Sequence, residues 1–234
     1  MKMLPVAILA GGLATRLGKL TEHVPKSLIE VAGRPFIVHQ LQLLAQLGAE
    51  HVVLCIGHLG EMVQRCVGDG RDFGLRVHYS LDGSAPLGTG GAVRQALPQL
   101  GERFFVLYGD SYLRNPMVPV QQEFQRSTAP ALMCVLRNEG RWERSNVDFA
   151  EGRVRRYSKR EPSPDMQYVD YGLSAFTAAA VSAMPLQFDL GDLFESAARD
   201  GQLAGYEIFE RFYEVGSVQG ITALESFLTS RKAS

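Results

Sequence analysis

Short apolar runs alternate along the first half of the chain with segments in which apolar positions recur at helical spacing. Four runs have the length of a strand, at residues 6–10, 51–56, 75–81 and 104–108. Residues 35–47 have the period of a helix, with Pro35 suited to a first turn and Gly48 as a stop signal, and a second helix is predicted at about 91–97. Repeated strand–helix units of this kind predict a parallel sheet with helices on both faces.

After Asp110 the pattern loosens. Strands are predicted at residues 131–137, 154–157 and 169–176, separated by polar, charged or proline-bearing stretches. A helix near 190–200, a short strand at 212–215 and a closing helix at about 217–230 complete the chain. No internal repeat or linker divides it. The predicted fold class is α/β: a three-layer, Rossmann-like single domain (1–234) with a mostly parallel mixed central sheet and a small substrate lobe.

The composition argues against several classes of binding partner. Lys plus Arg (24) nearly balances Asp plus Glu (25) in a chain of 234 residues, so no net field favours a nucleic acid or a membrane surface. The apolar run at the amino terminus is too short for a signal peptide or a membrane span. The three cysteines form no C-x-x-C pair, which favours free thiols in a reducing compartment. We therefore expect a cytoplasmic protein.

A glycine pair follows the first predicted strand. Gly11 and Gly12 let backbone N–H groups approach a phosphate closely, and Arg16 and Lys26 are cations that can offset its charge. Ligands of open α/β sheets bind at the carboxyl ends of the strands, where this loop would lie. A bare Gly-Gly is more often a simple turn, so the prediction depends on the residues around it.

Several motifs in order strengthen it: L-A-G-G-L-A-T-R-L at 9–17, P-K-S-L at 25–28, A-G-R-P-F at 32–36, P-L-G-T-G-G-A at 86–92 and Y-G-D-S at 108–111. Together they resemble the signature of the sugar-1-phosphate nucleotidyltransferases, also called nucleotide-sugar pyrophosphorylases. The resemblance weakens but continues to the end of the chain. Residues 88–91, 146–147 and 213–216 are most similar to the heptose-1-phosphate and mannose-1-phosphate guanylyltransferases, although relatives that use CTP or UTP are similar too.

The resemblance implies a magnesium-dependent enzyme that joins the nucleotidyl group of an NTP to a sugar 1-phosphate and releases pyrophosphate. It implies catalytic roles for Arg16, Lys26 and Asp110. The residues that it implies for nucleotide binding are Leu9, Ala10, Gly11, Gly12, Gly88 and Thr89. Residues 1–110 would then form the nucleotide-binding part and 111–234 the sugar-phosphate part and closing helix.

For the sugar phosphate, the resemblance implies Asn146, Lys159 and Gly172, with Arg160 as an alternative to Lys159. Eight basic residues lie between 137 and 160, interleaved with acidic ones, and a solvated lobe of mixed charge accounts for most of them. Only Lys159 or Arg160 needs a function.

Asp110 and Glu214 are the implied magnesium ligands. Asp110 follows an apolar strand, so its carboxylate should project at the edge of the sheet, where it needs a cation or water. Magnesium in proteins takes one or two carboxylates together with phosphates and waters. Glu214 stands where many members of the family have aspartate or asparagine. Both residues follow short apolar segments, so we expect them to converge on one site.

Competing classes lack their signatures. The spacing from Gly12 to Gly18-Lys19 and the following Leu20 do not match a P-loop, and Gly11-Gly12-Leu13 does not match G-x-G-x-x-G. Asp110 is not part of the D-x-D of many glycosyltransferases. A sugar-nucleotide sensor without turnover stays open, as does an enzyme of the same fold acting on another phosphorylated or phosphonate substrate. The expected partners are NTP and sugar 1-phosphate, with no nucleic acid or membrane; a homo-oligomer is compatible with the sequence.

Overall fold

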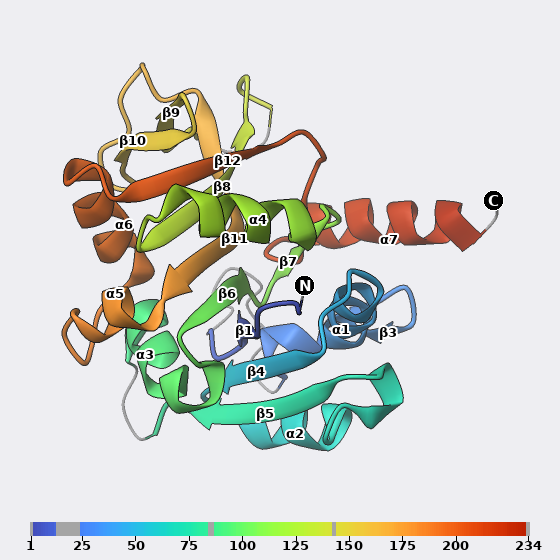
Figure 1. Cartoon of the computed structure of the whole chain (residues 1–234). Helices are drawn as coiled ribbons and strands as arrows, with labels where there is room; N and C mark the ends of the chain where they lie inside the picture. Colours follow the sequence, from blue (N-terminus) through green and yellow to red (C-terminus); the bar gives the residue numbers. More distant parts are fainter. Residues whose placement is uncertain (1, 13–23, 84–86, 142–143, 233–234) are drawn as a thin grey trace.

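The computed structural model describes residues 2–12, 24–83, 87–141 and 144–232 (Figure 1). The strands are β1 (Val6–Leu9), β2 (Glu30–Val31), β3 (Arg34–Pro35), β4 (His51–Ile56), β5 (Arg76–Leu81), β6 (Arg103–Tyr108), β7 (Ser111–Tyr112), β8 (Ala131–Arg137), β9 (Val147–Ala150), β10 (Arg153–Tyr157), β11 (Tyr168–Thr177), β12 (Leu203–Ile208) and β13 (Tyr213–Glu214). Nine of them form one sheet in the order β5-β4-β1-β6-β11-β8-β12-β10-β9, and β2-β3 and β7-β13 form two small pairs.

The α-helices are α1 (Phe36–Gln46), α2 (Gly60–Val67), α3 (Gly88–Leu100), α4 (Met117–Ser127), α5 (Ala178–Ser182), α6 (Leu190–Arg199) and α7 (Val218–Lys232). Short 3-10 helices lie at Lys26–Leu28 and Arg71–Phe73. In the described residues, no helix is both long and apolar enough to cross a membrane.

The first four strands of the sheet, β5-β4-β1-β6, are all parallel. In the central strand β1, Ile8 lies opposite Leu54 of β4 and Leu107 of β6. Val6 and Ile8 contact the core on one face of the sheet and Ala7 contacts the core on the other. Strands buried on both faces are continuously apolar rather than alternating, as the sequence of β1 is.

Strands β11, β8, β12, β10 and β9 make a second, mainly antiparallel part. Strand β11 runs antiparallel to β6 and β8, and its pairing with β9 through Tyr168 and Val147 closes the five strands into a small barrel. The sheet is therefore mixed, as predicted, but it is not mostly parallel: parallel pairing is limited to the first four strands and the β8–β12 pair. The small barrel occupies the region that the sequence indicated as a separate lobe.

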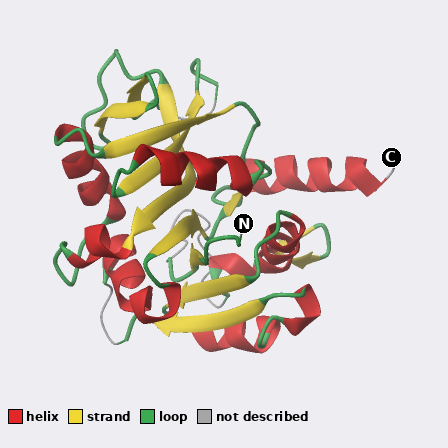
Figure 2. Ribbon diagram, viewed as in Figure 1, coloured by secondary structure: helices red, strands yellow, loops and turns green. Residues whose placement is uncertain are grey.

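Helices cover both faces of the sheet (Figure 2). One core contains residues of α1, α2 and α4, including Leu41, Val63 and Phe124. The other contains residues of α3, α5 and α6, among them Val93 and Phe194. Helix α7 extends from the body and packs through Leu224 on a third cluster that includes Phe36 and Tyr112.

Most predicted elements are confirmed to within three residues at each end, including the strands at 51–56 and 131–137. The elements that were not predicted are helices α2, α4 and α5 and strands β2, β3, β7, β9 and β12. Helix α2 has only eight residues. It begins after Leu59, which has φ 60° but is not a residue type that signals the start of a helix. Strand β12 contains Gly205, which weakens the strand pattern, but its space is filled by the Phe149 ring.

The order of the strands creates a switch point beside β1. The chain passes from β1 through α1 to β4 and through α2 to β5, and then crosses the other face through α3 to reach β6 on the far side of β1. In sheets of this kind, ligands bind outside the carboxyl ends of the strands where the order reverses. The loops that follow β1, β4, β5 and β6 meet there.

Removal of the Phe194 ring should destabilise the fold. Phe194 is 0% exposed and its ring lies 5.5 Å from that of Phe176 and 5.4 Å from that of Tyr157. We expect Phe194→Ala to lower the free energy of unfolding by about 3 to 5 kcal/mol in chemical denaturation, through lost burial and the cavity left behind. The control, Phe209→Ala, changes a ring that is 84% exposed and should cost less than about 0.5 kcal/mol. Equal losses in the two variants would contradict the packing described.

Candidate active site

Glycines allow three strand ends to approach one another. A Cβ at Gly11 would lie 2.9 Å from the Gly57 nitrogen, and a Cβ at Gly109 would overlap the Leu9 carbonyl oxygen. The Ala10 N–H donates to the Cys55 carbonyl over 2.8 Å, which joins the ends of β1 and β4. Because no side chain separates these segments, the backbone itself forms part of the surface.

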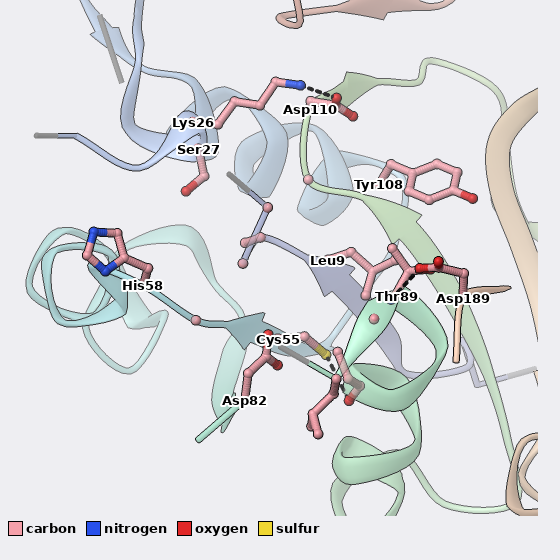
Figure 3. A pocket seen from close by; sticks show the side chains of 18 of the residues that line it. Leu9, Lys26, Ser27, Cys55, His58, Asp82, Thr89, Tyr108, Asp110 and Asp189 are labelled. Carbon is pink, nitrogen blue, oxygen red and sulfur yellow. Dashed lines mark hydrogen bonds and ion pairs between the residues drawn. The ribbon is translucent and has the colours of Figure 1, made fainter. Parts of the chain in front are cut away.

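That surface borders a cavity of about 570 Å³ (Figure 3). Its lining residues are Leu9, Ala10, Gly11, Gly12, Lys26, Ser27, Cys55, Gly57, His58, Asp82, Gly83, Leu87, Gly88, Thr89, Ala92, Tyr108, Gly109, Asp110 and Asp189. The structure thus brings together all six residues predicted to bind nucleotide, together with Lys26 and Asp110. Arg16 lies outside the described residues.

Lys26 and Asp110 form an ion pair at one end of the cavity. The Lys26 Nζ lies 2.5 Å from Asp110 Oδ2, and the two side chains are 22% and 28% exposed. Ser111 Oγ donates to the other carboxylate oxygen, Oδ1, over 3.3 Å. Gly216 lies beside the ammonium group, since a Cβ there would be 3.4 Å from Nζ. Two residues separated by 84 positions therefore meet as a cation and an anion at the end of β6.

The segment that contains Glu214 pairs with the segment that follows Asp110. Glu214 lies opposite Ser111 in the β13–β7 pair, and the Val215 N–H donates to the Asp110 carbonyl over 2.9 Å. The predicted proximity of residues 110 and 214 is thus seen in the backbone. The Glu214 side chain is exposed and is not among the residues lining the cavity.

The amino terminus of α3 is fixed to that of α6. Asp189 Oδ1 accepts hydrogen bonds from the Thr89 N–H and Oγ1, at 3.2 and 3.3 Å. Thr89 Oγ1 in turn accepts from the Leu190 N–H over 2.9 Å. These contacts hold the start of α3 and its loop as one wall of the cavity.

A second polar cluster surrounds Asp170, which lies beside Tyr108, a residue that lines the cavity. Asn146 Oδ1 accepts from the Asp170 N–H, and the Asp170 carboxylate accepts from the Gly172 N–H, each over 3.0 Å. The Tyr108 hydroxyl lies 3.5 Å from Asp170 Oδ2, and the Lys159 ammonium lies 5.2 Å from the centroid of the Tyr108 ring. All three residues predicted for the sugar phosphate therefore gather around Asp170 and Tyr108.

Electrostatics in this cluster show which groups are shielded from water. Burial raises the pKa of Asp170, although Lys159 and the hydrogen bond from Gly172 act in the opposite direction. Burial, followed by the nearby Asp170 carboxylate, raises the pKa of Tyr108 well above its usual range. Tyr108 is thus a neutral hydrogen-bond donor at neutral pH.

Gly172 connects the second cluster to the first. Its φ of 89° is in the left-handed region, where β11 departs from regular pairing with β8 between Asp170 and Ser174. A Cβ at Gly172 would lie 3.2 Å from the oxygen of Ser111, the residue after Asp110. The irregular strand therefore brings the Asp170 cluster beside the end of β6.

Lys159 and Arg160 lie in different surroundings. Lys159 faces the ring of Tyr108, a residue that lines the cavity, whereas Arg160 lies 3.9 Å from Asp192 of α6 and is 82% exposed. Both side chains are exposed, and the two adjacent cations, which the sequence could not distinguish, differ in their neighbours: Tyr108 for Lys159 and Asp192 for Arg160.

The residues present fit a magnesium ion that is held partly by a nucleotide. No group of three or more His, Cys, Asp or Glu side chains in the described part of the chain could hold a metal by itself. Asp110 nevertheless offers a carboxylate at the cavity, already paired with a cation. One or two carboxylates completed by phosphate oxygens and waters is the usual arrangement for magnesium.

Sequence reasoning missed Asp82, Tyr108, Asp170 and Asp189. Two of them carried a detectable signal: Asp170 is a carboxylate within the apolar strand β11, and Asp189 immediately precedes a predicted helix. Asp82 and Tyr108 stand at strand ends, where polar groups are common, so only the fold shows that they face the cavity.

Several known proteins are similar in sequence to most of this chain. Mannose-1-phosphate guanyltransferase beta-B of Xenopus laevis is 26% identical over 217 residues, 89% of this chain and 60% of that protein. Glucose-1-phosphate thymidylyltransferase of Streptomyces antibioticus is 32% identical over 182 residues, 76% of this chain and 50% of that protein. The chain thus spans between half and three fifths of the length of these relatives.

Solved structures share the fold. HddC from Yersinia pseudotuberculosis, complexed with GMP-PN, superposes with a TM-score of 0.80 over 97% of this chain and 100% of that one, at 19% identity. The family model described as "Nucleotidyl transferase" matches residues 6–231, which includes both polar clusters. The chain therefore belongs to the nucleotidyl transferase family, which confirms the resemblance to sugar-1-phosphate nucleotidyltransferases that its motifs indicated.

Proposed function

We propose that this protein transfers the nucleotidyl group of an NTP to a sugar 1-phosphate, giving a nucleotide-diphospho-sugar and pyrophosphate. The observation that carries the proposal is the meeting, in one cavity, of the glycine-rich end of β1 with Lys26 and Asp110, beside the cluster around Asp170. The first set suits a triphosphate, and the second offers a cation and hydrogen-bonding groups for a phosphorylated sugar.

In this proposal the nucleotide lies across the end of β1. Gly11 and Gly12 present backbone to the phosphates, while Gly88 and Thr89 border the nucleobase. Lys26 and Arg16 stabilise the charge that develops on the departing pyrophosphate. Asp110, with Glu214 beside its strand, would hold magnesium, which neutralises phosphate charge when bound. In this structure the Lys26 ammonium and the Asp110 carboxylate contact each other. For Lys26 to bind a phosphate oxygen and Asp110 to bind the metal, that contact must break.

At the other end, Lys159 and the groups around Asp170 hold the sugar phosphate. A non-bridging oxygen of the sugar 1-phosphate forms a bond to the α-phosphorus, and the bond from that phosphorus to the β-bridging oxygen breaks. The electron pair leaves with pyrophosphate. The nucleophile is already anionic, so no general base is needed, and catalysis depends on alignment of the two substrates and on charge stabilisation.

For the substrates, we propose a guanylyl transfer of the GDP-heptose or GDP-mannose type, within the cytoplasm. Support comes from the motif at residues 88–91 and from relatives named as mannose-1-phosphate guanyltransferases. Relatives named as thymidylyltransferase and uridylyltransferase also match, so use of CTP, UTP or another phosphorylated or phosphonate substrate is the alternative.

Release of pyrophosphate tests the proposal. The full chain with magnesium, incubated with five nucleotides (GTP, ATP, CTP, UTP and dTTP) against a panel of hexose and heptose 1-phosphates, should release pyrophosphate only when one NTP and one sugar phosphate are both present. Tight binding of a nucleotide sugar without pyrophosphate release in any pair would identify a sensor instead.

Replacement of Lys26 should affect turnover much more than folding. We expect Lys26→Ala to lower kcat by about 100- to 1,000-fold, as is common when one group that stabilises transition-state charge is removed. The melting temperature should change little, because the ammonium is at the cavity surface. Turnover close to that of the wild type in a folded variant would exclude Lys26 from the phosphate site.

Lys159 and Arg160 allow a matched comparison. Lys159→Met should raise KM for the sugar phosphate by roughly 10- to 100-fold through loss of a charged hydrogen bond, and should leave the Kd for NTP nearly unchanged. Arg160→Met removes the same charge one residue away and should have little effect on either constant. The assignment fails if the two variants exchange these behaviours, or if Lys159→Met weakens NTP binding equally.

Asp110 and Glu214 should differ in their effect on magnesium. We expect Asp110→Asn to abolish turnover, because the proposed ligand loses its charge, and Glu214→Gln to reduce turnover and raise the magnesium concentration that gives half-maximal rate. Glu102→Gln, an exposed change of the same type, is the control. A magnesium titration curve that is unaltered by either variant would remove that residue from the metal site.

A further inference from the structure

Helix α1 buries a polar side chain that its packing does not require. The buried residues of this helix, which the structure describes throughout, are apolar except for Gln40, which is 1% exposed. Gln40 stands one turn from Phe36, Ile37 and Leu44, all of them buried. An apolar side chain there would pack without loss of hydration, whereas a buried amide needs hydrogen-bond partners. The presence of glutamine therefore calls for another reason.

Both donors of the Gln40 amide go to the turn between β6 and β7. Its Nε2 donates to the Tyr108 carbonyl over 3.0 Å and to the Ser111 carbonyl over 2.9 Å. These two carbonyls flank Gly109 and Asp110, so one amide group connects the two ends of the turn. The amide oxygen, Oε1, is buried and has no hydrogen-bond partner in the part of the chain that the structure describes.

The orientation of this amide is fixed by its two acceptors. In the reversed orientation Oε1 would face two carbonyl oxygens, and three acceptors without a donor would repel one another. In the observed orientation one buried oxygen stays unpaired, which lowers the stability of the fold. What glutamine supplies, and an apolar residue does not, is a fixed link between the two ends of the turn that contains Asp110.

Backbone hydrogen bonds hold the rest of the turn. The Gly109 N–H donates to the Leu9 carbonyl over 3.1 Å, and the Asp110 carbonyl accepts from the Val215 N–H over 2.9 Å. These bonds connect the turn to β1 and to the end of β13, and Gln40 connects it to α1. Asp110, whose side chain borders the cavity, therefore lies in a turn that three separate segments hold.

We propose that Gln40 is a positioning residue for magnesium-dependent nucleotide binding, because it holds the turn that sets the direction of the Asp110 carboxylate. This inference rests on the proposed function, in which Asp110 holds magnesium beside the nucleotide phosphates. Gln40 is not among the described residues that line the cavity, so its effect on a ligand must pass through the turn. Loss of a group that orients a metal ligand typically weakens metal affinity by about 10- to 100-fold.

Gln40→Met tests the proposal, since methionine has a similar length and no donors. The Kd of the full chain for a nucleotide is measured by calorimetric titration with magnesium and, separately, with a chelator in its place. GTP is the probe, or the one of the five nucleotides that binds the wild type most tightly. Magnesium should lower this Kd in the wild type, and Gln40→Met should lose most of that gain while its Kd in chelator stays close to that of the wild type.

Turnover gives a second measurement. We expect the magnesium concentration for half-maximal rate to rise by about 10- to 100-fold in Gln40→Met. Excess magnesium should then restore much of the turnover. A variant that had merely lost folded protein would show a lower rate at every magnesium concentration.

Gln121→Met is the matched control. Gln121 is also 1% exposed, and its amide also joins distant backbone: Oε1 accepts from the Leu4 N–H and Nε2 donates to the Lys2 carbonyl, each over 2.9 Å. Lys2 and Leu4 precede β1, whereas the cavity lies at the other end of that strand. Both variants should lower the melting temperature, but only Gln40→Met should change the effect of magnesium.

Circular dichroism shows whether the variants fold, and Gln40→Asn, which keeps the amide on a shorter side chain, replaces Gln40→Met if the latter does not. An unchanged magnesium effect, an equal change in Gln121→Met, or no magnesium effect in the wild type with any of the five nucleotides overturns the inference. Pyrophosphate release with unaltered magnesium dependence in the Gln40 variant would keep the proposed function and refute the role of Gln40. A magnesium effect on nucleotide binding that is lost in this variant, without pyrophosphate release from any substrate pair, would do the reverse.

Discussion

The contact between Lys26 and Asp110 sets the local charge at one end of the cavity. Among the described residues that line it, Asp82, Asp110 and Asp189 are acidic and Lys26 is the only lysine or arginine. An anionic triphosphate enters such a site only if its charge is offset locally, because the whole chain carries a formal net charge of −1 and supplies no general attraction. Lys26 supplies one charge, and its pairing with Asp110 keeps both groups in place until a ligand competes for them. Partial removal from water strengthens each of these interactions.

Close approach of strand ends makes that contact possible. Gly11 and Gly109 remove side chains where β1 would otherwise be separated from β4 and β6, and Gly172 bends β11 towards Ser111. In the proposed function, the parallel half of the sheet would provide the nucleotide side of the site and the small barrel the sugar-phosphate side. Tyr108 belongs to both, because it lines the cavity and also contacts Asp170 and Lys159. In the proposed function, alignment of the two anionic substrates would depend on the junction between β6 and β11.

Much of the fold and of the site could be predicted from the sequence. Continuous apolar strands such as β4 and a helix with clear end signals such as α1 are determined locally, so their bounds were predicted closely. Gly11, Gly12, Lys26 and Asp110 belong to motifs that follow one another along the chain in the order typical of the family. The structure places these four residues in one cavity. The place of Asp82 in the cavity could not be predicted, since it depends on how the strand ends meet and not on its neighbours in sequence. The barrel could not be predicted because its closure depends on a long-range pair, Tyr168 with Val147.

Positional labelling of the nucleotide shows whether the α-phosphorus is the atom attacked. With the full chain, magnesium, a sugar 1-phosphate that supports turnover and NTP labelled at one phosphorus, we expect an α label in the nucleotide-diphospho-sugar and a γ label only in pyrophosphate. A γ label transferred to the sugar phosphate would indicate a kinase. An α label released as free nucleoside monophosphate would indicate a hydrolase, and either result would contradict the account.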